Sequence, residues 1–261
     1  MNHPLDGARL KVVWAQKDLK SLKDEVARYL ASNSYEFVTE SDANNKTARL
    51  VIKTEPPLDL SHLIGQCANG LRASLDYIVW QLAIRYSPKA PEVGKDRIYF
   101  PLQKDSATFN ANALAKYSIP ANAIGAIESV QPYQAGYERL AAIPDLTNED
   151  RHRLPLLTLA RVSGTSIRFR DDKGKTIFGI VGAVVGEGFT GHLSGAGIAL
   201  NALGTSQPAL SPENVKVEAQ ATVFVAFQNS VMPREPVDRT LEQMVECVAR
   251  VVPRFDSFFS S

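Results

Sequence analysis

A long apolar run enclosed by prolines is the feature that most constrains how this chain can fold. It extends from about Leu60 to Arg85, after Pro57 and before Pro88. Its apolar residues are Leu60, Leu63, Ile64, Cys67, Leu71, Leu75, Ile78, Val79 and Leu82. These positions cover most of the circumference of a helix, and such a helix is normally buried inside a domain. We therefore expect a buried central helix, with Asp59 or Ser61 as its N-cap.

Two further segments have helical periodicity. Apolar residues recur in steps of three and four from Leu10 to Leu30, and again from Pro236 to Phe255. Both patterns predict amphipathic helices that cover a core. The seven-residue spacing in the first segment also permits a homodimer, although burial against the chain's own core explains the same spacing.

The other predicted elements are shorter helices and strands. Two β-prone runs around an Asn/Asp cluster predict a hairpin over residues 35–53, and short helices are expected near 107–117, 121–130 and 154–162. Strands are expected at 166–169, 175–185 and 215–227. The prediction is an α+β fold. One domain of 261 residues would have a mainly helical lobe (1–162) and a lobe with a small, mostly antiparallel sheet and a C-terminal helix (163–261).

The composition excludes several classes of protein. There are 29 Lys+Arg and 28 Asp+Glu, so the formal charge of +1 argues against binding nucleic acid by overall charge. No apolar run reaches the roughly 18 residues of a membrane span, and the N-terminus has no signal-peptide pattern. We expect a soluble, cytoplasmic protein without membrane contact. The 2 cysteines fall in apolar helical patterns and are expected to be reduced core thiols.

The motifs that would indicate a cofactor or metal lack their structural context. Residues 186–191 match G-x-G-x-x-G, but a glycine-rich stretch follows where a dinucleotide-binding fold needs a helix. A hairpin loop and sheet bend that use glycine for positive φ are therefore the favoured interpretation. The four histidines are dispersed and form no metal-binding spacing. The sequence predicts no cofactor and no metal.

The few polar residues of the central helix fall on one side of it. His62, Gln66, Asn69, Arg72 and Asp76 lie within about 120° of one another on a helical wheel. Arg72 and Asp76 are spaced to form an i, i+4 pair. The strip is either the solvated face of a core helix or the polar wall of a cleft, in which Arg72 clamps an anion and Asp76 orients it.

A second polar cluster runs from Glu149 to Arg153. It places Arg151, His152 and Arg153 directly after two carboxylates at an expected helix start. Helix capping by Asn148, with the acids facing the helix dipole, accounts for the cluster. Alternatively, the two flanking arginines favour the neutral imidazole and let His152 act as acid or base near pH 7.

The region from Leu60 to Leu154 carries several short motifs. They are LIGQCANGLRASLDYIVWQL at 63–82, FPL at 100–102, QPY at 131–133 and NEDRHR at 148–153. As a set they resemble an uncharacterised group of bacterial and phage-associated proteins with H-x-L-R-x-A-L-D-H, F-P-[IL], Q-P-Y and N-x-D-K-H-R. The group has no established activity that would carry over to this chain.

The helix motif is also similar to HEPN-type helical proteins, whose metal-independent ribonucleases use R-x(4–6)-H. In that resemblance Arg72 would hold the scissile phosphate and a histidine would move the proton. Tyr77 occupies the histidine position here, and a tyrosine hydroxyl is a poor base near pH 7. His62 or His152 would have to supply the imidazole. The expected strands after residue 163 are a further departure from that helical family.

Two functions follow from these observations. The first is a non-catalytic binding or interaction protein, in which His62, Asn69, Arg72, Asp76, Arg151, His152 and Arg153 hold the fold together or bind a protein partner or an anion such as RNA. The second is a metal-independent RNA phosphodiesterase, with Arg72, Asp76, Arg151 and His152 as its catalytic set. The near-neutral charge favours the first.

Overall fold

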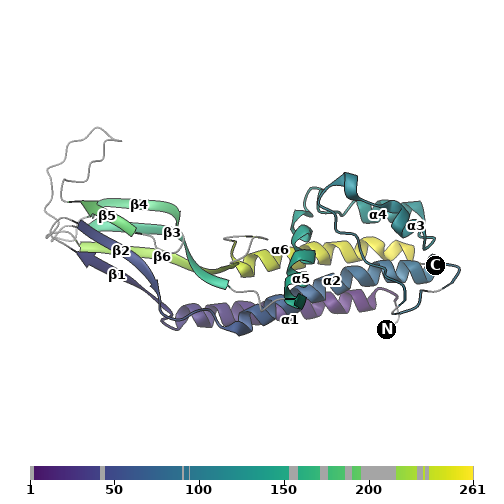
Figure 1. Ribbon diagram of the computed structural model, residues 1–261, viewed down its shortest axis with the longest axis horizontal. Coiled ribbons are helices and arrows are strands. Elements are labelled where there is room, and N and C mark those ends of the chain that lie inside the picture. Colours follow the sequence, from purple (N-terminus) through teal and green to yellow (C-terminus); the bar gives the residue numbers. More distant parts are fainter. Residues whose placement is uncertain are drawn as a thin grey trace. The chain divides into compact units, whose positions relative to one another are not determined.

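The computed structural model describes the backbone of residues 3–41, 45–89, 91–93, 95–152, 158–170, 176–185, 190–194, 216–227, 232 and 235–260. Side chains are described for residues 3–36, 53–89, 91–93, 95–151, 224–227, 232 and 235–260. The chain forms two compact units, and each is built from segments distant in sequence (Figure 1). We call Met1–Glu25, Pro57–Thr158 and Phe227–Ser261 the helical unit, and Val26–Pro56 with Leu159–Ala226 the strand unit.

Three long helices dominate the helical unit. They are α1 (Asp6–Ala31, whose last turns belong to the strand unit), α2 (Leu58–Tyr86) and α6 (Val237–Val251). The shorter elements are η1 (Ser106–Thr108), α3 (Ala111–Ala115), α4 (Ala121–Glu128), η2 (Glu138–Ala142), α5 (Ile143–His152) and η4 (Val252–Phe258). In Figure 1, α1, α2 and α6 run alongside one another and α5 lies across them. None of the described helices is both long and apolar enough to cross a membrane.

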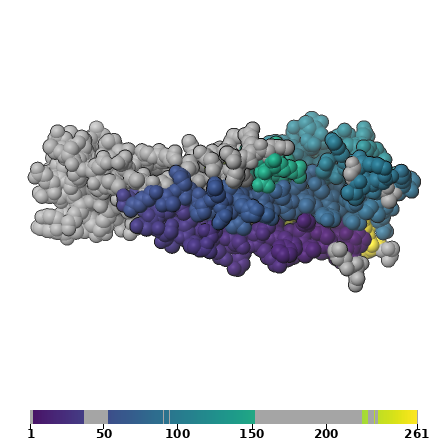
Figure 2. All heavy atoms as spheres, turned by 60° about the horizontal axis from the view of Figure 1, so that its bottom comes forward, coloured from purple at the N-terminus to yellow at the C-terminus, as the bar shows by residue number. Residues whose placement is uncertain are grey.

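Small residues let α1 and α2 approach closely. A Cβ on Gly70 would lie 3.5 Å from the Cβ of Ala15, and the Ser74 hydroxyl donates to the Ala8 carbonyl at 2.9 Å. Figure 2 shows the two helices side by side on one face of this unit. This approach buries the apolar stripe of α1, including Val12, Leu19 and Leu22. The stripe is therefore covered by the chain itself, and its seven-residue spacing needs no second copy.

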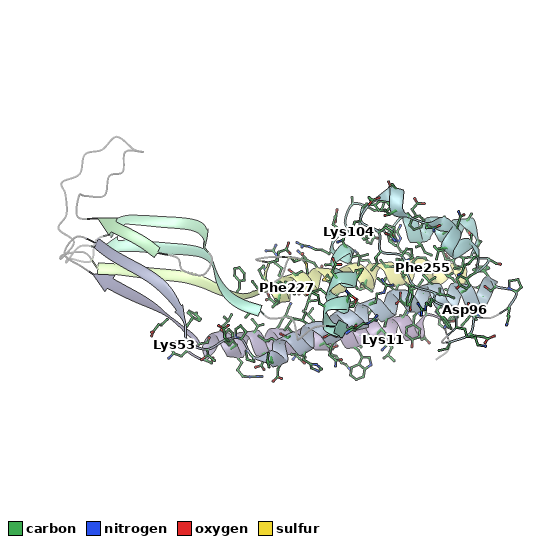
Figure 3. The ribbon with its side chains drawn as sticks, in the orientation of Figure 1. Lys11, Lys53, Asp96, Lys104, Phe227 and Phe255 are labelled. Atoms are coloured by element: carbon green, nitrogen blue, oxygen red, sulfur yellow. The ribbon has the colours of Figure 1, made fainter. Side chains whose placement is uncertain are left out.

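The core of the helical unit surrounds α2, which contacts α5, α6 and η4. Leu71, Leu75 and Ile78 of α2 are fully buried. Figure 3 labels Phe255 of η4 in the helical unit. Phe100, from the loop after α2, meets Phe255 edge to face with ring centres 6.4 Å apart. Aromatic rings prefer this arrangement because the positive edge of one faces the negative face of the other. The contact fixes the loop against the end of the chain.

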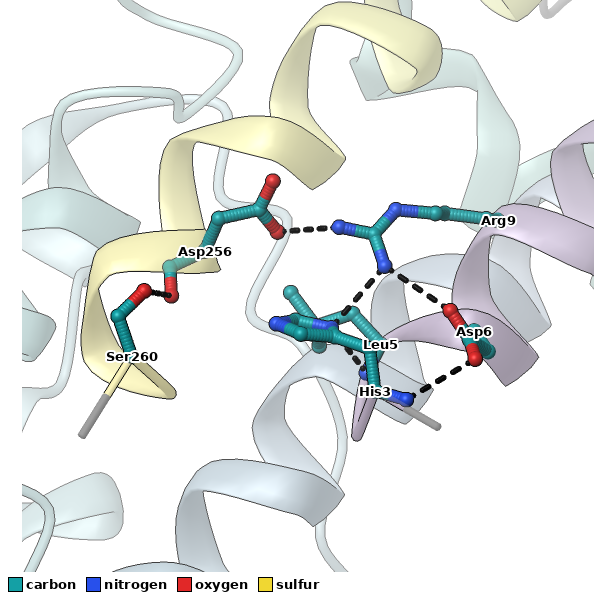
Figure 4. A network of polar contacts seen from close by, with 6 residues as sticks. All are labelled: His3, Leu5, Asp6, Arg9, Asp256 and Ser260. Carbon is teal, nitrogen blue, oxygen red and sulfur yellow. Dashed lines mark hydrogen bonds and ion pairs between the residues drawn. The ribbon is translucent and has the colours of Figure 1, made fainter. Parts of the chain in front are cut away.

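The first turn of α1 is tied to the last helical turns of the chain. Arg9 forms ion pairs with Asp6 at 3.1 Å and with Asp256 of η4 at 2.6 Å. Arg9 also donates a hydrogen bond to Nδ1 of His3 when that nitrogen is unprotonated, and the backbone N–H of His3 donates to Asp6 (Figure 4). These contacts place both ends of the described chain at the same end of the helical unit.

The strand unit contains β1 (Tyr35–Ser41), β2 (Asn45–Ile52), β3 (Thr158–Arg170), β4 (Thr176–Val185), β5 (Thr190–Ser194) and β6 (Lys216–Phe227, of which Phe227 belongs to the helical unit). Backbone pairing gives the orders β1-β2-β5 and β4-β3-β6. β1 and β2 pair antiparallel from Tyr35↔Ile52 to Ser41↔Lys46, where the sequence predicts a hairpin. β3 and β4 are antiparallel with register shifts between Val162 and Ser166.

The described part of the chain is mostly helical, as predicted, with differences at helix ends. α2 begins at Leu58 after Pro57, so neither Asp59 nor Ser61 is its N-cap. The C-terminal helix changes from α to 3-10 at Val252, next to Pro253, whose ring cannot continue the α-helical hydrogen-bond pattern. Of the predicted glycine-rich loop, residues 186–189 lie outside the described residues and Gly191 lies in β5 opposite Ala48.

The helix predicted over 154–162 is wrong. Residues 158–162 are strand, and the helix instead precedes them as α5, with Pro144 in its first turn. Proline is favoured there because its fixed φ suits a helix start. Asn148 therefore lies inside α5 and caps nothing, and Glu149 and Asp150 stand near the C-terminal end of the helix. The cations that follow them, not the acids, are favoured by the helix dipole.

Candidate functional site

Arg72 and Asp76 form a two-pronged ion pair one helical turn apart on α2. Arg72 Nε donates to Asp76 Oδ2 at 3.0 Å, and Nη2 lies 3.0 Å from Oδ1. The two side chains are 17% and 25% exposed. Such a bidentate pair fixes the plane of the guanidinium. Arg72 is therefore held in one orientation before any ligand arrives.

Asp76 also holds the loop that follows α2. Its Oδ1 accepts a hydrogen bond from the backbone N–H of Phe100 at 2.8 Å. Burial raises the pKa of Asp76 above its ordinary value of 3.8, while the positive charges of Arg72 and Arg151 and the Phe100 N–H act in the opposite direction. The carboxyl group thus joins the central helix to a loop 24 residues further along.

Gln131 holds the same loop from the other side. This fully buried amide accepts from the backbone N–H of Gln103 at 3.0 Å and donates to the carbonyls of Pro101 at 2.8 Å and Ile127 at 3.1 Å. Three of the motifs seen in the sequence, those at 72–76, 100–102 and 131–133, therefore meet at one place. Their shared task is to fix the loop formed by residues 97–103, which we call the clamped loop.

The clamped loop forms one wall of a cavity of about 400 Å³. The other walls come from Arg72 of α2, from Asn110, Ala113, Leu114 and Tyr117 around α3, and from Pro144 of α5. The volume lies within the roughly 300–1,000 Å³ range of small-molecule sites. We call this space the Arg72 cavity.

Two arginines are the only charged residues among the described residues that line the Arg72 cavity. Arg97 is exposed and forms no hydrogen bond or ion pair with any described residue. Arg72 lies under Tyr99, with its guanidinium carbon 5.8 Å from the ring centre, and the Tyr99 side chain is itself 58% exposed. The site therefore contains Arg72, which is ion-paired with Asp76, and Arg97, which has no partner among the described residues. Tyr99 adds an aromatic surface.

The rest of the polar strip is divided among separate partners. Asn69 donates to Asp150 of α5 at 2.6 Å, and a Cβ on Gly65 would come within 2.2 Å of the same carboxylate. This contact explains why α2 carries a glycine where α5 crosses it. Asn69 is thus used in helix packing and does not line the Arg72 cavity.

His62 lies at the exposed beginning of the strip. Its Nε2 is 3.2 Å from the Gln66 amide nitrogen, and its charge lowers the pKa of Asp18 on α1, which burial raises. These neighbours place His62 toward α1, and it does not line the Arg72 cavity.

The second polar cluster is described only in part. Arg151 is exposed and forms no hydrogen bond or ion pair within the described residues, yet its charge acts on Asp76. The side chain of His152 and the whole of Arg153 lie outside the described residues. The structure therefore pairs Arg72 with Asp76, and the positive charge of Arg151 acts to lower the pKa of that carboxyl group, which burial raises. It does not test the place of the histidine. No group of three His, Cys, Asp or Glu side chains in the described part of the chain could hold a metal ion.

Several residues of the cavity have no signal in the sequence. Arg97 and Tyr99 lie in a proline-punctuated region without helical or strand periodicity, and the short helix predicted over 107–117 gives no sign that Asn110 and Tyr117 line a cavity. The F-P-L and Q-P-Y motifs were the available signal, because a buried glutamine beside a proline-rich loop indicates hydrogen bonds to that loop.

Comparison with protein-family models, curated proteins and solved structures returns no match. The resemblances to the phage-associated group and to HEPN-type proteins therefore stay predictions.

Proposed function

We propose that this chain is a non-catalytic binding protein whose helical unit takes an anionic ligand in the Arg72 cavity. The observation that carries the proposal is the lining: two arginines, no carboxylate among the described lining residues, and otherwise mainly apolar walls. Ligand sites commonly combine an apolar cavity with a few placed polar groups. The buried hydrogen bonds of Asp76 and Gln131 support the proposal because they hold one wall in place before binding.

A thermal-shift panel on the full chain tests this proposal. We expect at least one of phenylacetate, phenyl phosphate, adenosine monophosphate and inorganic phosphate to raise the Tm of the wild type, because a ligand that binds only the folded state stabilises it. The Arg97→Gln variant should lose the shift. Lys20→Gln, which removes an exposed cation of α1 outside the cavity, should keep it. A panel that leaves the wild-type Tm unchanged at millimolar concentrations would refute the proposal.

A metal-independent RNA phosphodiesterase is the second candidate. It is favoured by Arg72, whose guanidinium is oriented by Asp76, and by the positive charge of Arg151, which acts to lower the pKa of that carboxyl group against the effect of burial. Such a reaction needs positive charge to stabilise the phosphate. The test is cleavage of mixed-sequence single-stranded RNA in EDTA by the wild type, by His152→Ala and by His62→Ala. Asn148→Ala, an exposed change on α5, is the control. Cleavage that one histidine variant alone abolishes would make this function primary.

We also propose the α+β class for the whole chain. The antiparallel registers of β1 with β2, β2 with β5 and β3 with β4 support a mostly antiparallel sheet arrangement beside the helical unit's own core. A far-ultraviolet circular dichroism spectrum that requires no strand contribution would count against this class.

A further inference from the structure

We infer that the ligand of the Arg72 cavity is a monocarboxylate with an apolar body, an inference that rests on the proposed function. It names the chemical class of the ligand, and it follows from the charges, donors and apolar surfaces that line the cavity.

The net charge of the cavity wall favours a monoanion. The positive charge of Arg72 is balanced by Asp76 through their two-pronged ion pair. Arg97 then remains as the single uncompensated cation of the described lining. One carboxylate neutralises one guanidinium, whereas a phosphate dianion would leave a charge without a partner in a site with few other polar groups. The planar guanidinium also matches a carboxylate with two parallel hydrogen bonds.

The side-chain amide of Asn110 gives the cavity lining a second hydrogen-bond donor for a carboxylate. Asn110 uses its side-chain oxygen to accept from the backbone N–H of Ala113. That bond leaves the amide nitrogen as the free end of the side chain, and no described residue accepts from it. An NH₂ group and a guanidinium that line the same cavity suit a ligand group that only accepts, as an ionised carboxylate does.

The other residues that line the cavity are mainly apolar, and they suit a ligand with an apolar body. Ile98, Phe100 and Leu114 are almost fully buried and line the cavity together with Pro101 and Leu102. Tyr99 and Tyr117 add aromatic rings. A ligand that fills this space gains by removing apolar surface from water, so a bare anion such as acetate should bind much more weakly than an aryl or branched acid.

The same chemistry is present in two sources. One is a free aromatic or branched aliphatic acid, and the other is the C-terminal carboxylate of a polypeptide that ends in an apolar residue. Both present one carboxylate attached to an apolar group, so the experiment has an arm for each.

Calorimetric titration of the full chain with matched probes tests the inference. Phenylacetate, phenylacetamide and phenyl phosphate share the ring and differ in charge. We expect phenylacetate to bind at least about tenfold more tightly than either of the other two, because only it matches one planar guanidinium in charge and geometry. Arg97→Gln should remove this preference, and Arg97→Lys, which keeps the charge without the fork, should restore part of it. The folding of both variants is checked by their Tm.

The second arm uses a short peptide ending in phenylalanine, with a free or an amidated C-terminus. Tighter binding of the free-carboxylate peptide than of phenylacetate assigns the ligand to a chain terminus, and binding of phenylacetate without the peptide assigns it to a small acid. Either result supports the inference. Equal affinity for phenylacetate and phenylacetamide overturns it, as does tighter binding of phenyl phosphate. In the last case the proposed anion-binding function survives, whereas binding of no probe removes both.

Discussion

Asp76 has two tasks at the residue scale, orienting Arg72 and fixing the backbone at Phe100. Its hydrogen bonds reach residues 4 and 24 positions away, so one carboxyl group joins the central helix to the clamped loop. The i, i+4 pairing of Arg72 with Asp76 could be predicted from spacing alone. The bond to Phe100 could not, because nothing local marks which backbone amide a side chain will reach.

The raised pKa of Asp76 predicts how stability changes with pH. A carboxyl group whose pKa is higher in the folded than in the unfolded state stabilises the fold fully below its ordinary value of 3.8. That contribution is lost as pH rises through the raised folded pKa. We therefore expect the free energy of unfolding of the wild type, relative to Asp76→Asn, to decrease as pH rises above about 4. Urea unfolding of both proteins at each pH measures it, and an increase with pH would contradict the assignment.

Replacing Gln131 with a residue of similar shape is expected to lower the free energy of unfolding substantially. Replacing it with Leu leaves the Gln103 N–H and the Pro101 carbonyl without their buried partner. Orphaned buried groups cost about 1–3 kcal/mol each, so Gln131→Leu should lose about 2–4 kcal/mol of unfolding free energy.

The matched control for Gln131 is Gln134→Leu. The Gln134 amide reaches only the Glu128 carbonyl, at 3.5 Å on the exposed side, so the change should stay within about 0.5 kcal/mol. Chemical denaturation of both variants compares them. Equal effects at the two positions would mean that Gln131 does not hold the clamped loop.

At the scale of elements, the packing of α5 on α2 depends on one missing side chain. Gly65→Ala would place a Cβ 2.2 Å from Asp150 Oδ1, and Asp150 is held there by Asn69. We expect Gly65→Ala to destabilise the protein by about 1–3 kcal/mol, although alanine is the better helix former.

Two comparisons separate this packing effect from helix propensity. Gly125 of α4 has no atom within 4 Å of an added Cβ, so Gly125→Ala should stabilise by up to about 1 kcal/mol. Adding Gly65→Ala to an Asp150→Ala protein should cost little, because the colliding carboxylate is gone. If both glycine substitutions stabilise the wild type equally, the close approach of α5 is not present in solution.

The sequence predicted the long helices well and the short elements poorly, for a physical reason. α1, α2 and α6 each bury apolar residues that recur every three or four positions, so the spacing of these residues predicts both the helix and its buried face. α5 has only 10 residues, fewer than three turns, and the strand that follows carries aliphatic residues that fit either structure. The position of Pro144 favours the start of the helix observed there, whereas the helix predicted over 154–162 begins about ten residues too late.

At the scale of the whole molecule, successive segments of the chain belong alternately to the helical unit and to the strand unit. The helical unit collects three segments, and the residues of the Arg72 cavity all belong to its middle one. Sequence periodicity predicts the long helices of that unit but not the cavity, because most of its wall is the clamped loop, which has no periodicity and is placed by contacts distant in sequence. The prediction of a single domain with a boundary at 162/163 stays a prediction.

The two cysteines report on the integrity of the helical unit. Cys67 of α2 is fully buried, and burial raises its pKa to about 12. Cys247 of α6 is also buried, and burial raises its pKa as well. The thiolate is the reactive form, so neither cysteine should react quickly with a disulfide reagent at pH 8 while the protein is folded. Both should react at once in denaturant. Rapid labelling of one thiol in the native protein would show that its helix is open.

A crystal structure of the full chain with phenylacetate at saturating concentration tests most directly whether the Arg72 cavity binds a carboxylate. We expect the carboxylate within hydrogen-bond distance of the Arg97 guanidinium, and the ring against the clamped loop. Arg72 should keep its two-pronged bond to Asp76. Phenylacetate bound elsewhere, or an empty Arg72 cavity at saturation, would contradict the account.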